Sequence, residues 1–72
     1  GDGSAKFVAM AGDEAVEKGV DCGEIASESS SVLGGGGGGR PSAGQGGGSK
    51  VEKLDEAIKV GLETLKNQIR GS

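Results

Sequence analysis

The sequence has 72 residues, a net charge of −3, 17 glycines, one aromatic side chain (Phe7), one cysteine (Cys22) and no histidine. This length allows one small domain at most, and a chain with so few large apolar residues is poorly equipped to build its own core. The lone cysteine excludes an intrachain disulfide, and the lack of histidine and of a cysteine cluster excludes a structural zinc site.

The same composition argues against two kinds of partner. The sequence has no basic patch and no set of stacking aromatic residues, so we expect no binding to nucleic acid. The longest apolar run, Phe7–Ala11, is too short to span a membrane. A cysteine without a disulfide partner favours a reducing, intracellular compartment.

The N-terminal segment, residues 1–33, is acidic and weakly patterned. It carries two lysines against seven acids, a net charge of −5. Ser4 can cap a helix over residues 5–11, and Asp13 can cap a second short helix. The run Phe7–Ala11 also fits a short strand, but we expect two short and weak helices here.

A serine-rich stretch closes this segment. Asp21 and Glu24 have the spacing of a capping box, so a brief helical turn can start there. The serines between residues 27 and 31, mixed with Glu28, are typical of a solvated loop. They are also candidate phosphate acceptors.

Residues 34–49, GGGGGGRPSAGQGGGS, contain ten glycines. This composition is typical of a flexible linker with one stiff point at Pro41. The composition is equally compatible with a natural linker and with a linker inserted by engineering. The glycines before Lys50 do not match a nucleotide-binding P-loop, because Gly48-Ser49-Lys50 has the wrong order and spacing.

The C-terminal stretch, residues 50–70, carries the strongest periodic signal. Six apolar residues recur every three or four positions and therefore fall on one stripe of an α-helix. Ser49 and Glu52 fit a capping box at its start. Gly61, beside the stripe, either admits a closely packed partner or is a tolerated weak point. The stripe consists of Val51, Leu54, Ile58, Leu62, Leu65 and Ile69.

No residue pattern indicates catalysis, cofactor binding or a metal site. The acidic pairs at Asp13 and Asp55 are typical of helix surfaces, because a catalytic pair requires a pocket that separates the two pKa values. Cys22 has no histidine to activate it and lies between acids that raise its pKa. We therefore predict that the chain is not an enzyme and binds no cofactor.

Together these features predict an all-α, small and partly disordered fold. An acidic N-terminal segment with short helices (1–33) is joined by a glycine-rich flexible linker (34–49) to an amphipathic helix (50–72). The two helical parts would pack as a helical hairpin or small bundle.

The predicted function is protein–protein interaction or assembly through the apolar stripe. The stripe would pack on the tethered N-terminal segment, in a homo-oligomer, or in a partner's hydrophobic groove. Two alternatives stay open. One is a membrane-surface helix, which the mixed-charge polar face argues against. The other is an engineered tethered fusion with no activity of its own.

Overall fold

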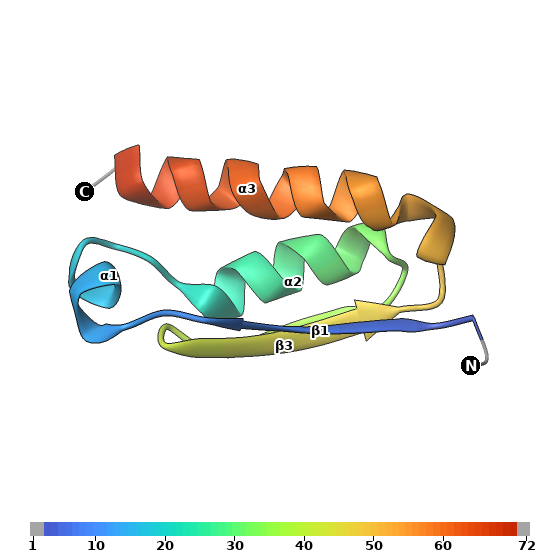
Figure 1. Ribbon diagram of the computed structural model, residues 1–72, viewed down its shortest axis with the longest axis horizontal. Coiled ribbons are helices and arrows are strands. Elements are labelled where there is room, and N and C mark those ends of the chain that lie inside the picture. Colours follow the sequence, from blue (N-terminus) through green and yellow to red (C-terminus); the bar gives the residue numbers. More distant parts are fainter. Residues whose placement is uncertain (1–2, 71–72) are drawn as a thin grey trace.

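The computed structural model describes residues 3–70, which form an α/β fold of three layers (Figure 1). An antiparallel sheet is the first layer, helix α2 (Cys22–Val32) is the second, and helix α3 (Leu54–Arg70) is the third. Helix α2 is therefore packed on both sides, by the sheet below and by α3 above.

Within residues 3–70 the sheet has three strands in the order β1-β3-β2, with bounds β1 (Ala5–Met10), β2 (Gly36–Arg40) and β3 (Ala43–Gly48). The chain passes from β1 to β2 through the short helix α1 (Asp13–Glu17) and through α2. It then turns at Pro41 and Ser42, and β3 inserts between the two earlier strands. Proline suits this turn because its fixed φ matches the second position of common β-turns.

The glycines of one sheet face bring the strands close to α2. A Cβ atom added to Gly46 or to Gly37 would collide with the hydroxyl of Ser30. A Cβ atom added to Gly44 would collide with the carbonyl group of Cys22. Glycine loses the most backbone entropy on folding, and here close contact between helix and sheet offsets part of that cost.

The core is built from small side chains. The largest fully buried side chains are those of Leu33 and Ser30, and Ala26 is also fully buried. On the other side of α2, Gly61 of α3 lies so close that a Cβ atom there would stand 2.7 Å from the hydroxyl of Ser29. Gly61 thus admits a closely packed helix, and that helix belongs to the same chain.

A side-chain clasp fixes the far end of α3 to the start of α2. The Asp21 carboxylate caps α2 by accepting from the N–H groups of Gly23 and Glu24, at 3.0 and 3.3 Å. The Gln68 amide accepts from the Asp21 N–H at 2.8 Å and donates to the Asp21 carbonyl at 3.0 Å. It also donates to the Glu24 carboxylate at 2.7 Å. The bonds from the N–H groups of Asp21, Gly23 and Glu24 satisfy donors that the helix start leaves unpaired.

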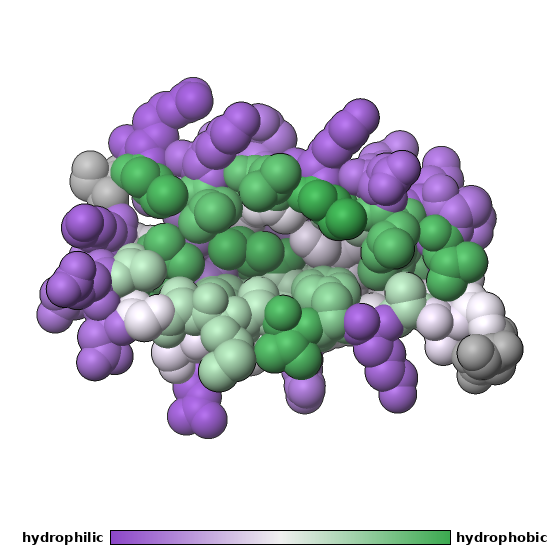
Figure 2. All heavy atoms as spheres, in the orientation of Figure 1, coloured by the Kyte–Doolittle hydropathy of each residue, from purple (hydrophilic) through white to green (hydrophobic). Residues whose placement is uncertain are grey.

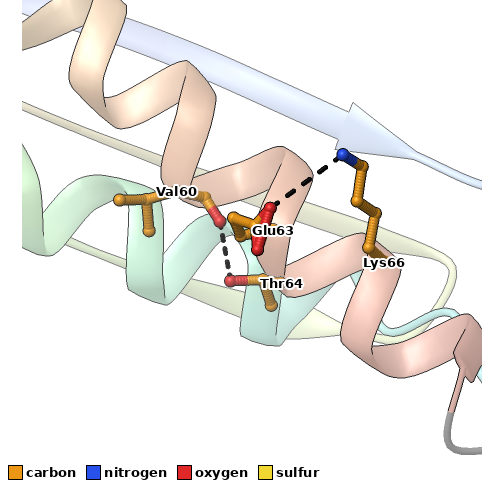
Figure 3. Close-up of polar contacts among 4 residues, drawn as sticks. All are labelled: Val60, Glu63, Thr64 and Lys66. Atoms are coloured by element: carbon orange, nitrogen blue, oxygen red, sulfur yellow. Dashed lines mark hydrogen bonds and ion pairs between the residues drawn. The ribbon is translucent and has the colours of Figure 1, made fainter.

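Helix α3 follows a turn of 3₁₀ helix, Val51–Lys53. The capping box predicted at Ser49 is wrong, because Lys50 occupies the cap position and no side chain bonds there. Figure 3 shows the Thr64 hydroxyl donating to the Val60 carbonyl at 2.9 Å, and the exposed pair of Lys66 and Glu63 at 3.9 Å. An exposed pair of this length adds little to stability.

The prediction of an all-α, partly disordered chain is wrong. The glycine-rich stretch expected to be a flexible linker, residues 34–49, forms β2 and β3. Residues 5–10 form strand β1 where a weak helix was expected, and the serine-rich stretch expected to be a loop lies inside α2. The predicted C-terminal helix is present, but it packs on α2 within a sheet-based fold and not in a helical hairpin.

The physical reason is that glycine content alone does not decide between coil and sheet. A glycine strand is costly in isolation, yet it gains ladder hydrogen bonds and a helix packed closely against its backbone. Both gains come from residues far away in the sequence, in β1 and α2, so no local window reveals them.

Candidate functional site

The sheet has an outer face, which points away from α2 and is free of any covering element within residues 3–70 (Figure 1). Side chains alternate between the two faces of a strand, so the residues of the outer face follow from the register. They form three cross-strand rows: Lys6–Gly47–Gly36, Val8–Gln45–Gly38 and Met10–Ala43–Arg40. We call these nine residues the outer face.

Gly36 and Gly38 make this face hollow without being required by the fold. A Cβ atom added to either glycine would meet no atom within 4 Å. Neither residue has a positive φ angle, so other residues could adopt the same backbone. A shallow hollow lies over this bare backbone, with Lys6, Val8 and Gln45 also along its walls. The missing side chains therefore leave room for a ligand to approach the sheet closely.

Two cations stand at opposite corners of the outer face. Lys6 and Arg40 are exposed, and neither makes an ion pair within residues 3–70. Their Cα atoms are about 16 Å apart by strand geometry, two strand spacings across and four residues along. None of the three strands contains an acid. The outer face is thus positive although the whole chain is negative.

The centre of the outer face combines one amide with apolar side chains. The Gln45 side chain is exposed, and its amide makes no hydrogen bond within the described part of the chain. Val8 beside it is 69% exposed and Met10 is 79% exposed. Unpaired cations at the corners, an unused amide and exposed apolar groups can together hold a polyanion that also carries flat, hydrogen-bonding groups.

The residues predicted to bind a partner lie elsewhere, five of them on α3 and Val51 on the 3₁₀ turn before it. Helix α3 buries Ala57 and Gly61 against α2, and the apolar stripe is rotated from this buried side by about a quarter turn, at 3.6 residues per turn. The stripe therefore stays at the surface, and Figure 2 shows apolar side chains gathered along α3. Its exposed members are Val51, Leu54, Ile58, Leu62 and Ile69, with Leu65 half-buried. That these six residues bind a partner stays a prediction.

The cysteine and the possible metal ligands of residues 3–70 do not form a second site. Burial, and then the neighbouring Asp21, raises the pKa of the Cys22 thiol. Residues 3–70 contain no group of three or more residues able to ligate a metal ion. No helix in that range is long and apolar enough to cross a membrane.

Comparison with known proteins assigns the family. The model of the DHHA1 domain matches residues 1–67. The chain belongs to the DHHA1 family. Over 81% of the present chain, this DHHA1 domain is 46% identical to the alanine–tRNA ligase of Caldicellulosiruptor saccharolyticus. Over 89% of the present chain, it is 48% identical to the alanine–tRNA ligase of Methanococcoides burtonii. It spans 7% of the length of each of these relatives.

A solved structure supports the same assignment. The C-Ala domain of Aquifex aeolicus alanyl-tRNA synthetase superposes with a TM-score of 0.74 at 38% identity. The match covers 88% of this DHHA1 domain and 55% of the C-Ala chain. The α/β fold is therefore that of a known domain, and the predictions of a helical bundle and of intrinsic disorder are corrected by it.

Family membership also corrects the predicted function and partners. The chain was expected to be a protein-interaction module working through an amphipathic helix, without a link to nucleic acid. Its relatives are instead ligases and synthetases named for tRNA. The family model runs through the glycine-rich stretch and covers most of the chain, so this stretch lies inside the family domain and is not the tether of an engineered fusion.

Sequence reasoning missed every residue of the outer face. One signal was available. Arg40-Pro41-Ser42-Ala43 is a turn sequence between two glycine-rich stretches, which fits a hairpin. A hairpin in that register places Gly36, Gly38 and Arg40 on one face, alternating with the glycines that pack against α2.

Proposed function

We propose that this DHHA1 domain is an RNA-binding accessory domain, and that its outer face binds tRNA. The observation that carries the proposal is the pair Gly36 and Gly38, which keep the outer face hollow although nothing in the fold requires glycine there. The names of the relatives supply the class of ligand, because they are alanine–tRNA ligases and an alanyl-tRNA synthetase.

The charges of the outer face support a polyanionic ligand. Lys6 and Arg40 are unpaired and separated, so each can contact a different phosphate along an RNA strand. The negative net charge of the chain opposes this binding only weakly. The acidic residues of the described part of the chain lie in the helices and loops. The charged residues of the three strands are both cations, Lys6 and Arg40. Screening over about 8–10 Å at ordinary salt weakens the field of the more distant acids.

The proposal assigns binding to this chain and places the chemistry of the ligase elsewhere. The chain spans 7% of its curated relatives, so a catalytic centre has ample room outside it. Its one cysteine is buried with a raised pKa, which makes it a weak nucleophile. The relatives' name for the reaction therefore describes the whole enzyme, and this domain would hold the tRNA for it.

The salt dependence of binding to a tRNA transcript tests the proposal. The slope of log K against log salt falls by about 1 for each phosphate that the protein no longer neutralises. We expect Lys6→Ala and Arg40→Ala each to lower the slope by about that amount, measured by fluorescence anisotropy. Lys59→Ala is the matched control, because Lys59 is exposed on α3 and its removal changes the net charge equally. Equal effects of Lys6→Ala and Lys59→Ala would contradict the outer face as the binding site.

A further inference from the structure

We infer that the outer face binds a base-paired stem of RNA across its minor groove, and that Gln45 contacts the ribose hydroxyls there. The inference rests on the proposed function and deepens it, because it names the form of RNA that the face accepts. Three features of the outer face carry it: the lack of aromatic side chains, the shape of the surface and the chemistry at its centre.

The outer face has no aromatic ring on which an unpaired base could stack, because none of its nine residues is aromatic. The one aromatic residue of the chain, Phe7, pairs with Gly46 in a row that faces α2. Sheets that bind single-stranded RNA hold the splayed bases on aromatic side chains. Paired RNA needs no such support, since its bases already stack on one another.

The shape of the outer face suits a convex ligand. Gly36 and Gly38 leave bare backbone with open space above it, whereas Lys6 and Arg40 carry long, exposed side chains at two opposite corners. A duplex is a convex cylinder, so its surface can lie in the hollow while the two cations reach phosphates on either side of a groove. The minor groove of an RNA duplex is wide and shallow, and it presents the sugars to such a surface.

The centre of the outer face carries an amide whose chemistry matches ribose. Gln45 lies in the middle row, between Val8 on β1 and Gly38 on β2. Its amide makes no hydrogen bond within the described residues, whereas the amide of Gln68 is engaged with Asp21. An amide both donates and accepts hydrogen bonds, as does the 2′-hydroxyl of ribose. Because every nucleotide of RNA carries this hydroxyl, the contact requires no particular base.

The two kinds of contact have different roles. Lys6 and Arg40 attract the phosphates of any nucleic acid, so they position the stem without identifying its sugar. Gln45 faces the sugars, and a DNA duplex offers it no 2′-hydroxyl and a narrower minor groove. An amide that loses its partner on binding lowers the affinity. The chemical class of ligand is therefore a paired RNA stem of any sequence.

The test uses the whole 72-residue chain and four ligands of one sequence, titrated by fluorescence anisotropy at fixed salt. They are an RNA duplex, the same duplex with 2′-O-methyl riboses, the DNA duplex and one RNA strand that does not fold on itself. We expect the RNA duplex to bind about tenfold or more tightly than the DNA duplex and the single strand. The methylated duplex keeps the groove but blocks the hydroxyls, so it should bind about threefold or more weakly than the RNA duplex.

Gln45→Ala isolates the contact to the hydroxyls. It should weaken binding to the RNA duplex to the level of the methylated duplex, and leave the salt slope unchanged because no phosphate contact is lost. Asn67→Ala is the matched control, since Asn67 is an exposed amide on α3, beyond α2 from the outer face. It should keep the full preference for the RNA duplex.

Two results would overturn the inference. One is a single strand or a DNA duplex that binds as tightly as the RNA duplex. The other is a Gln45→Ala variant that still prefers the RNA duplex to the methylated duplex by the original ratio. Both leave the proposed function standing if the tRNA transcript binds with the salt slopes expected for Lys6→Ala and Arg40→Ala. Failure of the tRNA transcript to bind would overturn the proposed function itself.

Discussion

The two faces of the sheet use glycine for different purposes. On the inner face, Gly37, Gly44 and Gly46 are glycine because α2 leaves no space for a side chain. On the outer face, Gly36 and Gly38 have open space above them. The residues alternate along a single run of sequence, so one composition serves both packing and an open surface.

This contrast allows effects on the stability of the fold to be separated from effects on ligand binding. A substitution on the inner face has to be accommodated by the core, and it should change the free energy of unfolding. A substitution at Gly36 or Gly38 on the outer face meets only solvent, and it should change ligand binding alone. Variants of the two faces should therefore differ in the kind of effect as well as in its size.

The largest effect is expected for Gly46→Ala on the inner face. Its new methyl group would collide with Ser30, and overpacking of this kind costs about 1–3 kcal/mol. A domain of this size is stable by only about 4–10 kcal/mol, so the destabilisation is substantial. Urea denaturation followed by circular dichroism would measure it.

A second variant shows whether the collision is the cause. Adding Ser30→Ala to Gly46→Ala removes the hydroxyl nearest to the new methyl group. The two changes should therefore be non-additive, with part of the stability recovered. Additive effects would mean that Gly46 is required for backbone reasons and not for its close approach to α2.

An intermediate effect, on binding alone, is expected for Gly38→Val on the outer face. Valine is favoured in strands and meets no neighbour here, so the unfolding free energy should fall by less than about 0.5 kcal/mol or rise. Its side chain would nevertheless fill the hollow and keep a ligand from the backbone. We expect tRNA affinity to drop about tenfold, or about 1.4 kcal/mol, by anisotropy titration. Unchanged affinity would show that the hollow is not used.

The smallest effect is expected for Ser30→Ala alone. The Ser30 hydroxyl is buried, and it has no hydrogen-bond partner within the described residues. Removing an unsatisfied hydroxyl from a helix interior should leave stability unchanged or raise it by up to about 1 kcal/mol. A marked decrease in stability in urea denaturation would mean that the hydroxyl contributes through weak interactions with the glycine backbone of the sheet.

The C-terminal helix was predictable because its signal is local. The spacing of six apolar residues over residues 50–70 indicates a helix without any knowledge of its partner. The same spacing misled about packing. Helix α3 buries the small residues Ala57 and Gly61, because α2 approaches it closely, and leaves much of the larger stripe exposed. Hydrophobicity alone would therefore predict the wrong side of α3 as the buried one.

The sheet was not predictable from the same rules. Strand signals depend on β-branched and aromatic side chains, and β2 and β3 have none. The outer face was hidden for a related reason. Lys6 and Arg40 are 34 positions apart in the sequence, so their shared, acid-free surface exists only after β3 has joined β1 to β2. The net charge of the whole chain is negative and therefore gave no sign of this positive surface.

The strand order has a consequence for the timing of folding during synthesis. The strands β1 and β2 do not pair with each other, and each pairs only with β3. A nascent chain that has emerged only as far as Arg40 therefore holds two strands and no ladder. The sheet can close only when residues 43–48 leave the ribosome, at which point one segment completes both pairings together. Until then, β1 presents unpaired edges on both sides, a state in which chaperones and neighbouring nascent chains compete for it.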